Sequence, residues 1–205
     1  MKRNFLMFST IAVIGTSLLM ACGAAATEEG ANEETASVEA KTMNVNLDAS
    51  SVMWKGTMLG VYSHEGTVKL TEGNVSVADG KITAGSFTVD LSNINPTDQN
   101  YDPAQDRSPE KLVGHLQSPD FFDVATYPTA SFVITGNKDG DLIGNLTVRG
   151  ITNEETVNNV SFNEANNTWT GTMTFDRKKY DVAWDSQMKD MVLSDDIELS
   201  VNLSL

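Results

Sequence analysis

The chain has 205 residues, 40% of them hydrophobic, and 14 basic residues against 28 acidic ones give a formal net charge of −14. This hydrophobic fraction is sufficient for a folded core, and so negative a chain disfavours binding to nucleic-acid phosphates. A single cysteine excludes a disulfide framework and any metal site built from several cysteines. With only two histidines available for metal or acid–base work, the composition argues against an enzyme.

The first 22 residues have the pattern of an export signal. Two basic residues precede an apolar run over residues 5–20, which ends in Leu19-Met20-Ala21-Cys22. The run is too short and too sharply ended for a membrane span, which needs about twenty apolar residues. The tetrad resembles a bacterial lipobox, which implies removal of residues 1–21 and attachment of lipid to the Cys22 sulfur. The alternative is an ordinary signal peptide followed by an incidental cysteine.

Residues 22–42 contain almost no large apolar side chain after the lipidated cysteine, so we expect a flexible acidic tether there. Without residues 1–21, twelve basic residues face 28 acidic ones, a formal charge of −16. That charge disfavours binding to anionic headgroups, and the acyl chains must therefore provide the anchor. We expect a cell-envelope lipoprotein, attached to a membrane on its periplasmic or outer surface, with its folded domain over residues 43–205.

The folded part has the period of two that is typical of strands with one apolar face. The alternation is cleanest over residues 197–205, and turn signals such as Asp79-Gly80, Asp139-Gly140 and Asn166-Asn167 separate the strands. Strands that recur at roughly ten-residue spacing favour an antiparallel barrel or a sandwich. We favour a barrel because closure removes unpaired edges, and the polar outer faces exclude a membrane barrel.

One segment breaks this period. Ser108 is a typical helix N-cap, Pro109 suits the first helical position, and apolar residues follow at helical spacing. The sequence therefore predicts a short helix after a polar loop at 95–107. Three apolar side chains would pack it against an opening or edge of the barrel: Leu112, Val113 and Leu116.

Candidate catalytic or metal-binding groups are sparse. His64 and His115 stand 51 positions apart, which is not the spacing of a local metal-ligand motif. The sequence also lacks a calcium loop, a nucleophile elbow, a phosphate loop and a dinucleotide fingerprint. We interpret both histidines as structural, with ligand contact as the alternative. We expect no enzyme, no catalytic residue and no metal.

Three segments resemble the YceI-like family. They are Trp54-Lys55-Gly56 through Val68, the block 112–132 with its Asp120-Phe121-Phe122-Asp123 and Tyr127-Pro128, and Leu142 through Thr152. The resemblance covers about residues 45–205. It implies an all-β, eight-stranded antiparallel, lipocalin-like barrel with a short helical insertion. It also implies an exported protein that binds a long polyisoprenoid, such as an isoprenoid quinone, inside the barrel.

The chain also departs from the family pattern. After Arg177 the usual glycine of the family's Arg-x-x-Tyr/Phe-Gly-Val is replaced by Asp181, and the region between Trp184 and Ser194 is short and rich in methionine. We therefore expect the end of the cavity beside these residues to differ from the corresponding end in other members of the family.

The apolar strand faces supply the candidate ligand-binding residues. We expect an elongated tunnel lined by Trp54, Phe87, Val89, Phe132, Leu146, Phe162 and Phe175, with His64 at most contacting a polar headgroup at the mouth. The only cofactor or partner expected is a bound isoprenoid quinone, polyprenyl lipid or similar long amphiphile. The alternative is a filled core, with the barrel acting as an envelope-stress or protein-interaction module. We expect Phe121 and Phe122 to be structural, with at least one ring buried.

Overall fold

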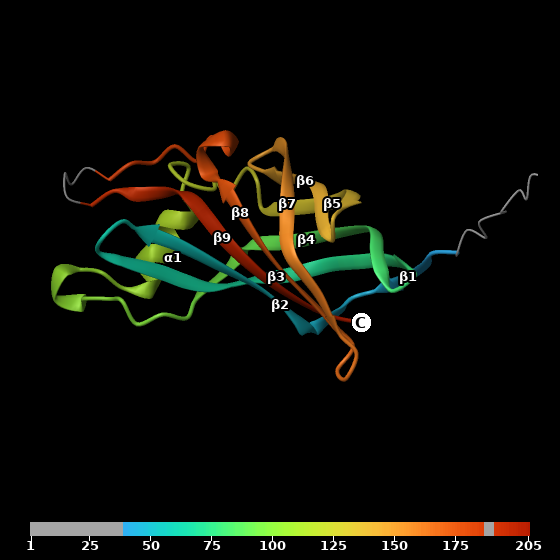
Figure 1. The fold of residues 1–205 in the computed structure, drawn as a ribbon. Helices are drawn as coiled ribbons and strands as arrows, with labels where there is room; N and C mark the ends of the chain where they lie inside the picture. The colour runs from blue at the N-terminus through green and yellow to red at the C-terminus, as the bar shows by residue number, and fades with distance from the viewer. Residues whose placement is uncertain (1–38, 187–190) are drawn as a thin grey trace, which may run out of the picture. The chain divides into compact units, whose positions relative to one another are not determined.

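The computed structural model describes residues 39–186 and 191–205, which form an antiparallel barrel of strands with one α-helix (Figure 1). The strands are β1 (Lys41–Asn44), β2 (Asn46–Met58), β3 (Tyr62–Ala78), β4 (Lys81–Pro96), β5 (Thr129–Lys138), β6 (Asp141–Val148), β7 (Ile151–Asn163), β8 (Thr168–Asp176) and β9 (Leu193–Ser204). The helical elements are the 3-10 turn η1 (Pro103–Gln105), the helix α1 (Pro109–Gln117) and the 3-10 turn η2 (Arg177–Tyr180).

Eight of these strands close the barrel. Their order is β3-β2-β9-β8-β7-β6-β5-β4, and β4 pairs back with β3 along most of its length. The short β1 precedes β2 in the chain and pairs with the C-terminal part of β3, which β2 does not reach. Between β1 and β2, the amide of Val45 donates to the carbonyl oxygen of Gly73. The predicted eight-stranded antiparallel, lipocalin-like barrel with a helical insertion is therefore confirmed, with β1 as a short addition.

The two ends of the barrel are built differently. At the end that we call the hairpin end, the β3–β4 and β5–β6 turns are Asp79-Gly80 and Asp139-Gly140, and residues 164–167 connect β7 to β8. All four residues of the two Asp-Gly turns have positive φ, the backbone of two-residue hairpins that match the twist of the strands. These are the turns that the sequence predicts.

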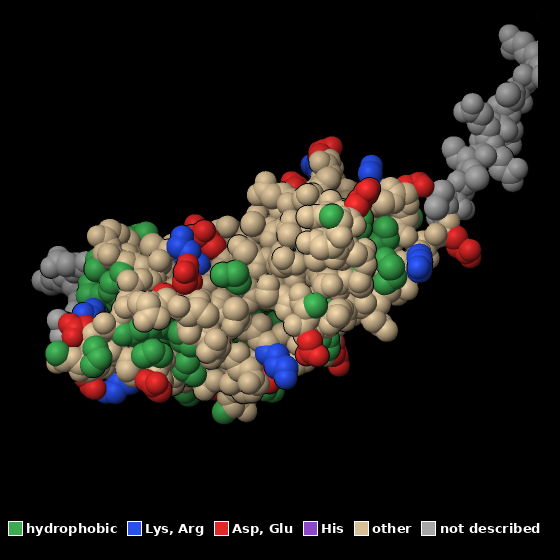
Figure 2. Space-filling model, turned by 90° about the horizontal axis from the view of Figure 1, so that it is seen from below, with side chains coloured by type: hydrophobic (Ala, Val, Ile, Leu, Met, Phe, Trp, Pro, Cys, Tyr) green, Lys and Arg blue, Asp and Glu red, His purple; other side chains and the backbone are tan. Residues whose placement is uncertain are grey.

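The opposite end, which we call the α1 end, carries the long connections. Residues 97–128, with α1, join β4 to β5, and the segment that follows η2 joins β8 to β9. The β2–β3 hairpin also lies here, with Leu59 and Val61 exposed and the amide of Leu59 bonded to the carbonyl of the exposed Val192. Figure 2 shows hydrophobic side chains gathered at the left, the side on which Figure 1 places α1 and this hairpin.

The predicted helix is present, and its start is confirmed. The Ser108 side chain accepts a hydrogen bond from the amide of Lys111, and Pro109 begins the helix. The side chain of Gln117 donates to two backbone carbonyl oxygens of β4 and so ties the last turn to the barrel. Leu112 and Leu116 lie on the wall of the interior, whereas Val113 is half-buried outside it.

The predicted signal peptide, the lipidation site at Cys22 and nearly all of the predicted tether lie outside the described residues. Over residues 39–186 and 191–205, no helix has the length and apolar character needed to cross a membrane.

Candidate functional site

A cavity of about 340 Å³ lies inside the barrel, lined by all eight barrel strands and by α1. Its wall extends along β9 from Leu193 at the α1 end to Leu203 near the hairpin end. Ten residues of strand correspond to roughly 33 Å at about 3.3 Å per residue. The sequence left open whether the interior is filled, and the structure favours an elongated, almost wholly apolar space.

Most of the residues predicted to line a tunnel lie on this wall. They are Trp54, Phe87, Val89, Phe132, Leu146 and Phe175, and His64 also belongs to the wall. Their contact with a ligand stays a prediction. The sequence analysis missed other wall residues, among them Tyr62, Trp169 and Trp184. For Trp169 the signal was available, since it alternates with polar residues along residues 169–175.

The prediction that Phe162 lines the tunnel is wrong. Its side chain is 38% exposed, and its ring packs on Trp169 with 4.8 Å between the ring centroids. The register of β7 against β8 shifts between Asn158 and Ser161, and Phe162 comes after that shift, one residue before the strand ends at the hairpin end. Phe162 is paired across the strands with Trp169, which does line the cavity, so alternation gives the side of the sheet but not which of two packed rings reaches the cavity.

One glycine shapes the cavity wall. A Cβ built on Gly144 would lie 2.4 Å from Cζ of Phe132, which sits on the neighbouring strand. The missing side chain lets the Phe132 ring lie against the backbone of β6. A larger residue at this position would push the ring towards the cavity or distort the sheet.

One polar part of the wall is a histidine held by a buried carboxylate. Nδ1 of His64 lies 3.1 and 3.2 Å from the two carboxylate oxygens of Asp98. The Asp98 side chain is only 5% exposed and also accepts from the amides of Glu65 and Asn100 and from the hydroxyl of Tyr101. Burial alone would raise the pKa of Asp98, but the bonds from Asn100, Glu65 and His64 together hold it below its usual range.

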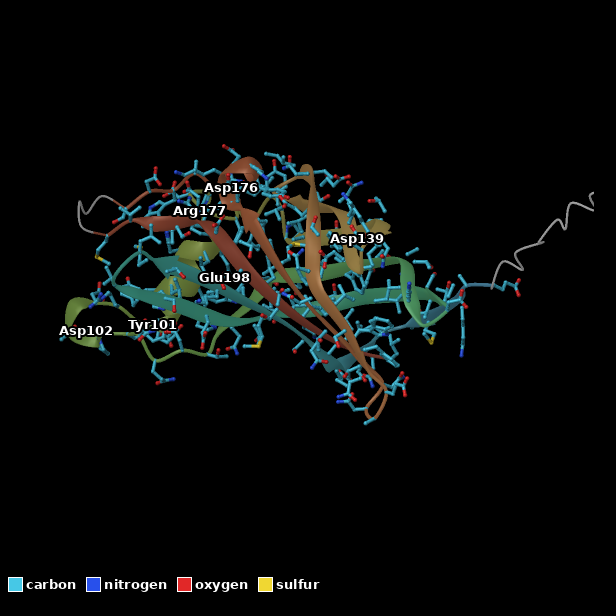
Figure 3. The ribbon with its side chains drawn as sticks, in the orientation of Figure 1. Tyr101, Asp102, Asp139, Asp176, Arg177 and Glu198 are labelled. Atoms are coloured by element: carbon cyan, nitrogen blue, oxygen red, sulfur yellow. The ribbon has the colours of Figure 1, made fainter. Side chains whose placement is uncertain are left out.

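Aromatic rings fix the orientation of this histidine. The His64 ring stacks on Tyr101 with 5.0 Å between centroids and meets the edge of Tyr62 at the same distance. Burial and the neighbouring Asp98 charge raise the pKa of Tyr101, so its phenol stays protonated and donates. Figure 3 shows Tyr101 and Asp102 together in the segment between β4 and α1.

The second histidine lies on the same wall and, among the described residues, has no carboxylate hydrogen-bonded to its ring. His115 packs edge-on against Phe121 and Trp184, with centroids 5.6 and 4.7 Å away. Its Nε2 is buried and, among the described residues, has no hydrogen-bond partner. Burial lowers the pKa of His115, although the charge of Asp120 opposes the shift. The prediction that at least one of the two rings is buried is confirmed by Phe121, and Phe122 is half-buried beside it.

Arg177 is fully buried where β8 leads into η2 (Figure 3). All five of its N–H groups are used, at donor–acceptor distances of 2.6 to 3.3 Å. The acceptors are the carbonyl oxygens of Val182, Trp184 and Ser194 and the carboxylates of Asp185 and Asp195. The guanidinium therefore holds the segment that follows η2 against the barrel and has no donor left for a ligand.

Tyr180 closes the barrel where β7 and β8 separate. Their pairing stops at Val157 and Met173, short of the α1 end. The fully buried ring of Tyr180 packs in this region, and its hydroxyl donates to the buried carboxylate of Glu155 at 3.0 Å. The next residue, Asp181, has φ of 58°, so the aspartate adopts the left-handed backbone for which glycine is usual.

No group of three or more His, Cys, Asp or Glu side chains in the described part of the chain is arranged to hold a metal ion.

The family whose description is YceI-like domain matches residues 43–205. The chain belongs to the YceI-like family. A UPF0312 protein of Pseudomonas putida is 33% identical over 125 residues, which cover 58% of this chain and 60% of that protein. A UPF0312 protein of Shewanella denitrificans is 28% identical over 127 residues, covering 60% of this chain and 62% of that protein. The alignment thus spans about three-fifths of the length of these curated relatives.

Two solved structures are similar to this chain to different degrees. BcnA of Burkholderia cenocepacia superposes with a TM-score of 0.61 at 22% identity, covering 78% of this chain and 98% of that one. A polyisoprenoid binding domain from Saccharophagus degradans, implicated in plant cell wall breakdown, is more distant, with a TM-score of 0.49 at 10% identity. It covers 80% of this chain and 97% of that domain. The likeness to BcnA supports the barrel topology described above.

Proposed function

We propose that this protein binds one long, uncharged lipid of the polyisoprenoid class inside its barrel and performs no catalysis. The observation that carries the proposal is the cavity of about 340 Å³, which is almost wholly apolar and follows the barrel from the α1 end towards the hairpin end. A long chain of apolar units matches such a wall along its whole length. Membership of the YceI-like family agrees with this role, because the resemblance of the sequence to that family implies a bound polyisoprenoid.

Burial of the chain supplies the driving force for binding. At about 25 cal/mol per Å², a ligand that buries roughly 300 Å² of apolar surface gains about 7 kcal/mol before the costs of association. No ion pair is required for binding of this strength. The bound lipid would be an isoprenoid quinone, a polyprenyl lipid or a similar long amphiphile.

The test is to extract the purified protein with organic solvent and identify the released lipid by mass spectrometry. A matched pair of variants makes the result specific. Val89 lies on the cavity wall, whereas Val133, on the neighbouring strand, is 46% exposed. Val89→Trp should abolish copurification of lipid with little loss of stability, because the new ring occupies the cavity, and Val133→Trp should leave lipid binding unchanged.

A filled interior gives the opposite pattern. Val89→Trp would then overpack the core and lower the free energy of unfolding by about 1–3 kcal/mol. That result, together with a parent protein that carries no lipid, contradicts the proposal.

We further propose that the barrel is anchored to a membrane of the cell envelope, on its periplasmic or outer surface, through lipid attached to Cys22. The proposal is based on the tetrad Leu19-Met20-Ala21-Cys22. Acyl chains contribute about 0.8 kcal/mol per buried methylene, so the mature protein should partition into detergent and Cys22→Ser should not. A Cys22→Ser protein that enters the detergent phase after cleavage of its precursor contradicts the lipobox interpretation.

A further inference from the structure

We propose that His64 is the specificity-determining contact for the head of the bound lipid, and that it selects a neutral hydroxyl head: an alcohol or a phenol. This proposal rests on the function proposed above, since it assumes that a lipid chain occupies the cavity. In the bound state Nε2 of His64 accepts a hydrogen bond from the hydroxyl group. Heads that carry a phosphate, or that lack a hydroxyl hydrogen, are bound less tightly, so among the proposed lipids a polyprenyl alcohol or phenol is preferred to an oxidised quinone.

The partner of His64 decides which ring nitrogen faces the ligand. Asp98 is nearly buried, and the bonds that it accepts favour its ionised form, which has acceptors only. The nitrogen beside it, Nδ1, must therefore carry the hydrogen. In the neutral ring Nε2 then carries the lone pair and acts as an acceptor. Among the described residues it has no hydrogen-bond partner, and the side chain is 18% exposed.

The ring is also held in place before any ligand arrives. Tyr101 stacks on one face, Tyr62 meets the ring at an edge, and the carboxylate of Asp98 is itself fixed by two backbone amides. Tyr62 and His64 both belong to the cavity wall near the start of β3. The head would thus sit at the α1 end, with the chain extending towards the hairpin end.

The charges of the wall oppose a phosphorylated head. Of the described residues that line the cavity, Arg177 is the only lysine or arginine, and its five N–H groups are all engaged by protein acceptors. Outside the lining, the guanidinium of Arg107 lies 5.9 Å from the centroid of the Tyr62 ring, but it is already paired with the carboxylate of Asp102 at 3.6 Å. Among the described residues, a phosphate placed here would therefore find little unpaired positive charge to offset its loss of hydration. A hydroxyl group needs only one acceptor, which His64 supplies.

The other histidine of the wall is less suited to this role. Nε2 of His115 is covered, with the rings of Phe121 and Trp184 packed against the imidazole. A ligand could reach it only after those rings move. His115 therefore provides a matched control, an imidazole on the same wall without the carboxylate.

The experiment compares three probes with one chain: geranylgeraniol, its methyl ether and its monophosphate. Dissociation constants are measured at pH 8 by equilibrium competition against tritiated geranylgeraniol, using the delipidated mature protein. The wild type should bind the alcohol about 2- to 10-fold more tightly than the ether, the range expected for one neutral hydrogen bond, and the phosphate most weakly. His64→Phe keeps a stacked ring but removes the acceptor, so alcohol and ether should bind equally.

Binding of the ether reports whether each variant is folded, because the ether makes only the apolar contacts. His64→Leu serves if His64→Phe does not fold, and His115→Phe should retain the preference for the alcohol. Equal binding of alcohol and ether by the wild type overturns the assignment, and so does tighter binding of the phosphate than of the alcohol. It is also overturned if the preference for the alcohol is retained in His64→Phe and lost in His115→Phe. If the wild type binds none of the three probes, the proposed lipid-binding function fails instead.

Discussion

The two ends of the barrel are closed by different physical means. At the hairpin end, Asp79-Gly80 and Asp139-Gly140 each turn the chain within two residues. Their left-handed backbone conformation is favoured by the turn residues themselves. At the α1 end, β6 and β7 are likewise joined by a two-residue turn, Arg149-Gly150. The two long connections there are held by contacts between residues far apart in sequence, such as Arg177 with Ser194 and His64 with Asp98. A two-residue turn cannot reach across a barrel opening. The end with long connections is therefore the end that can hold polar groups beside the cavity.

The largest effect should come from removing the buried ring that supports α1. Phe121→Ala should lower the free energy of unfolding by about 3–5 kcal/mol, because Phe121 is buried against His115 and Phe122. The half-buried Phe122 should give a smaller loss when changed to alanine. Urea unfolding followed by circular dichroism measures both. Two variants as stable as the parent would mean that the α1 end does not depend on this packing.

A somewhat smaller loss is expected at Arg177. Arg177→Met keeps an unbranched apolar stem but removes the guanidinium and leaves three backbone carbonyl oxygens without their donor, which should cost about 3 kcal/mol. The neighbouring Lys178 bonds to the same carboxylates from an exposed position, so Lys178→Met should change stability by less than about 0.5 kcal/mol. Equal effects at the two positions, measured in the same urea titration, would show that burial of the guanidinium is unimportant.

The hairpin end should respond to backbone conformation alone. Gly140 has φ of 99°, and a Cβ there would meet no atom within 4 Å, so Gly140→Ala should cost about 1–2 kcal/mol through strain only. Gly136 also has open space around its Cβ position but lacks a positive φ. Gly136→Ala is thus the control and should be nearly neutral in thermal unfolding. Similar losses at both glycines would exclude the backbone explanation.

The smallest effect should be a pH dependence of stability that arises from His115 at the α1 end. Burial lowers the pKa of His115 below its ordinary value of 6.5, so below about pH 6.5 the unfolded chain binds the proton more readily than the folded one. Stability is then lost as the pH falls from 6.5 towards the folded pKa. The wild type should lose more melting temperature than His115→Phe between pH 7.5 and 5.5. Parallel curves for the two proteins would show that His115 does not contribute.

The barrel and its hairpin end could be predicted from the sequence because they depend on local information. Alternation of apolar residues gives the strands, Asp139-Gly140 gives its turn, and Ser108-Pro109 gives the start of the helix. The same alternation placed Val89 on the cavity wall. It failed for Phe162, since a period of two does not show that the paired ring of Trp169, rather than Phe162, lies on the cavity wall.

The polar contacts of the α1 end could not be predicted in this way. His64 and Asp98 lie 34 positions apart, and nothing in the sequence around either residue indicates that the fold brings them together. Arg177 is a charged residue of the kind that usually lies on the surface, and its complete burial follows from five acceptors supplied by a later segment. Local patterns thus predict the wall of the cavity but not the chemistry at its end.

The distribution of tryptophan gives the protein a built-in optical probe. The chain has three tryptophans, and all of them, Trp54, Trp169 and Trp184, line the cavity. Essentially all of the indole emission therefore arises from the cavity wall, at both the α1 end and the hairpin end. A quinone ring lodged near Trp184 would quench a different part of that emission from one lodged near Trp169. The intrinsic fluorescence of the unmodified protein can thus report the direction in which a ligand lies.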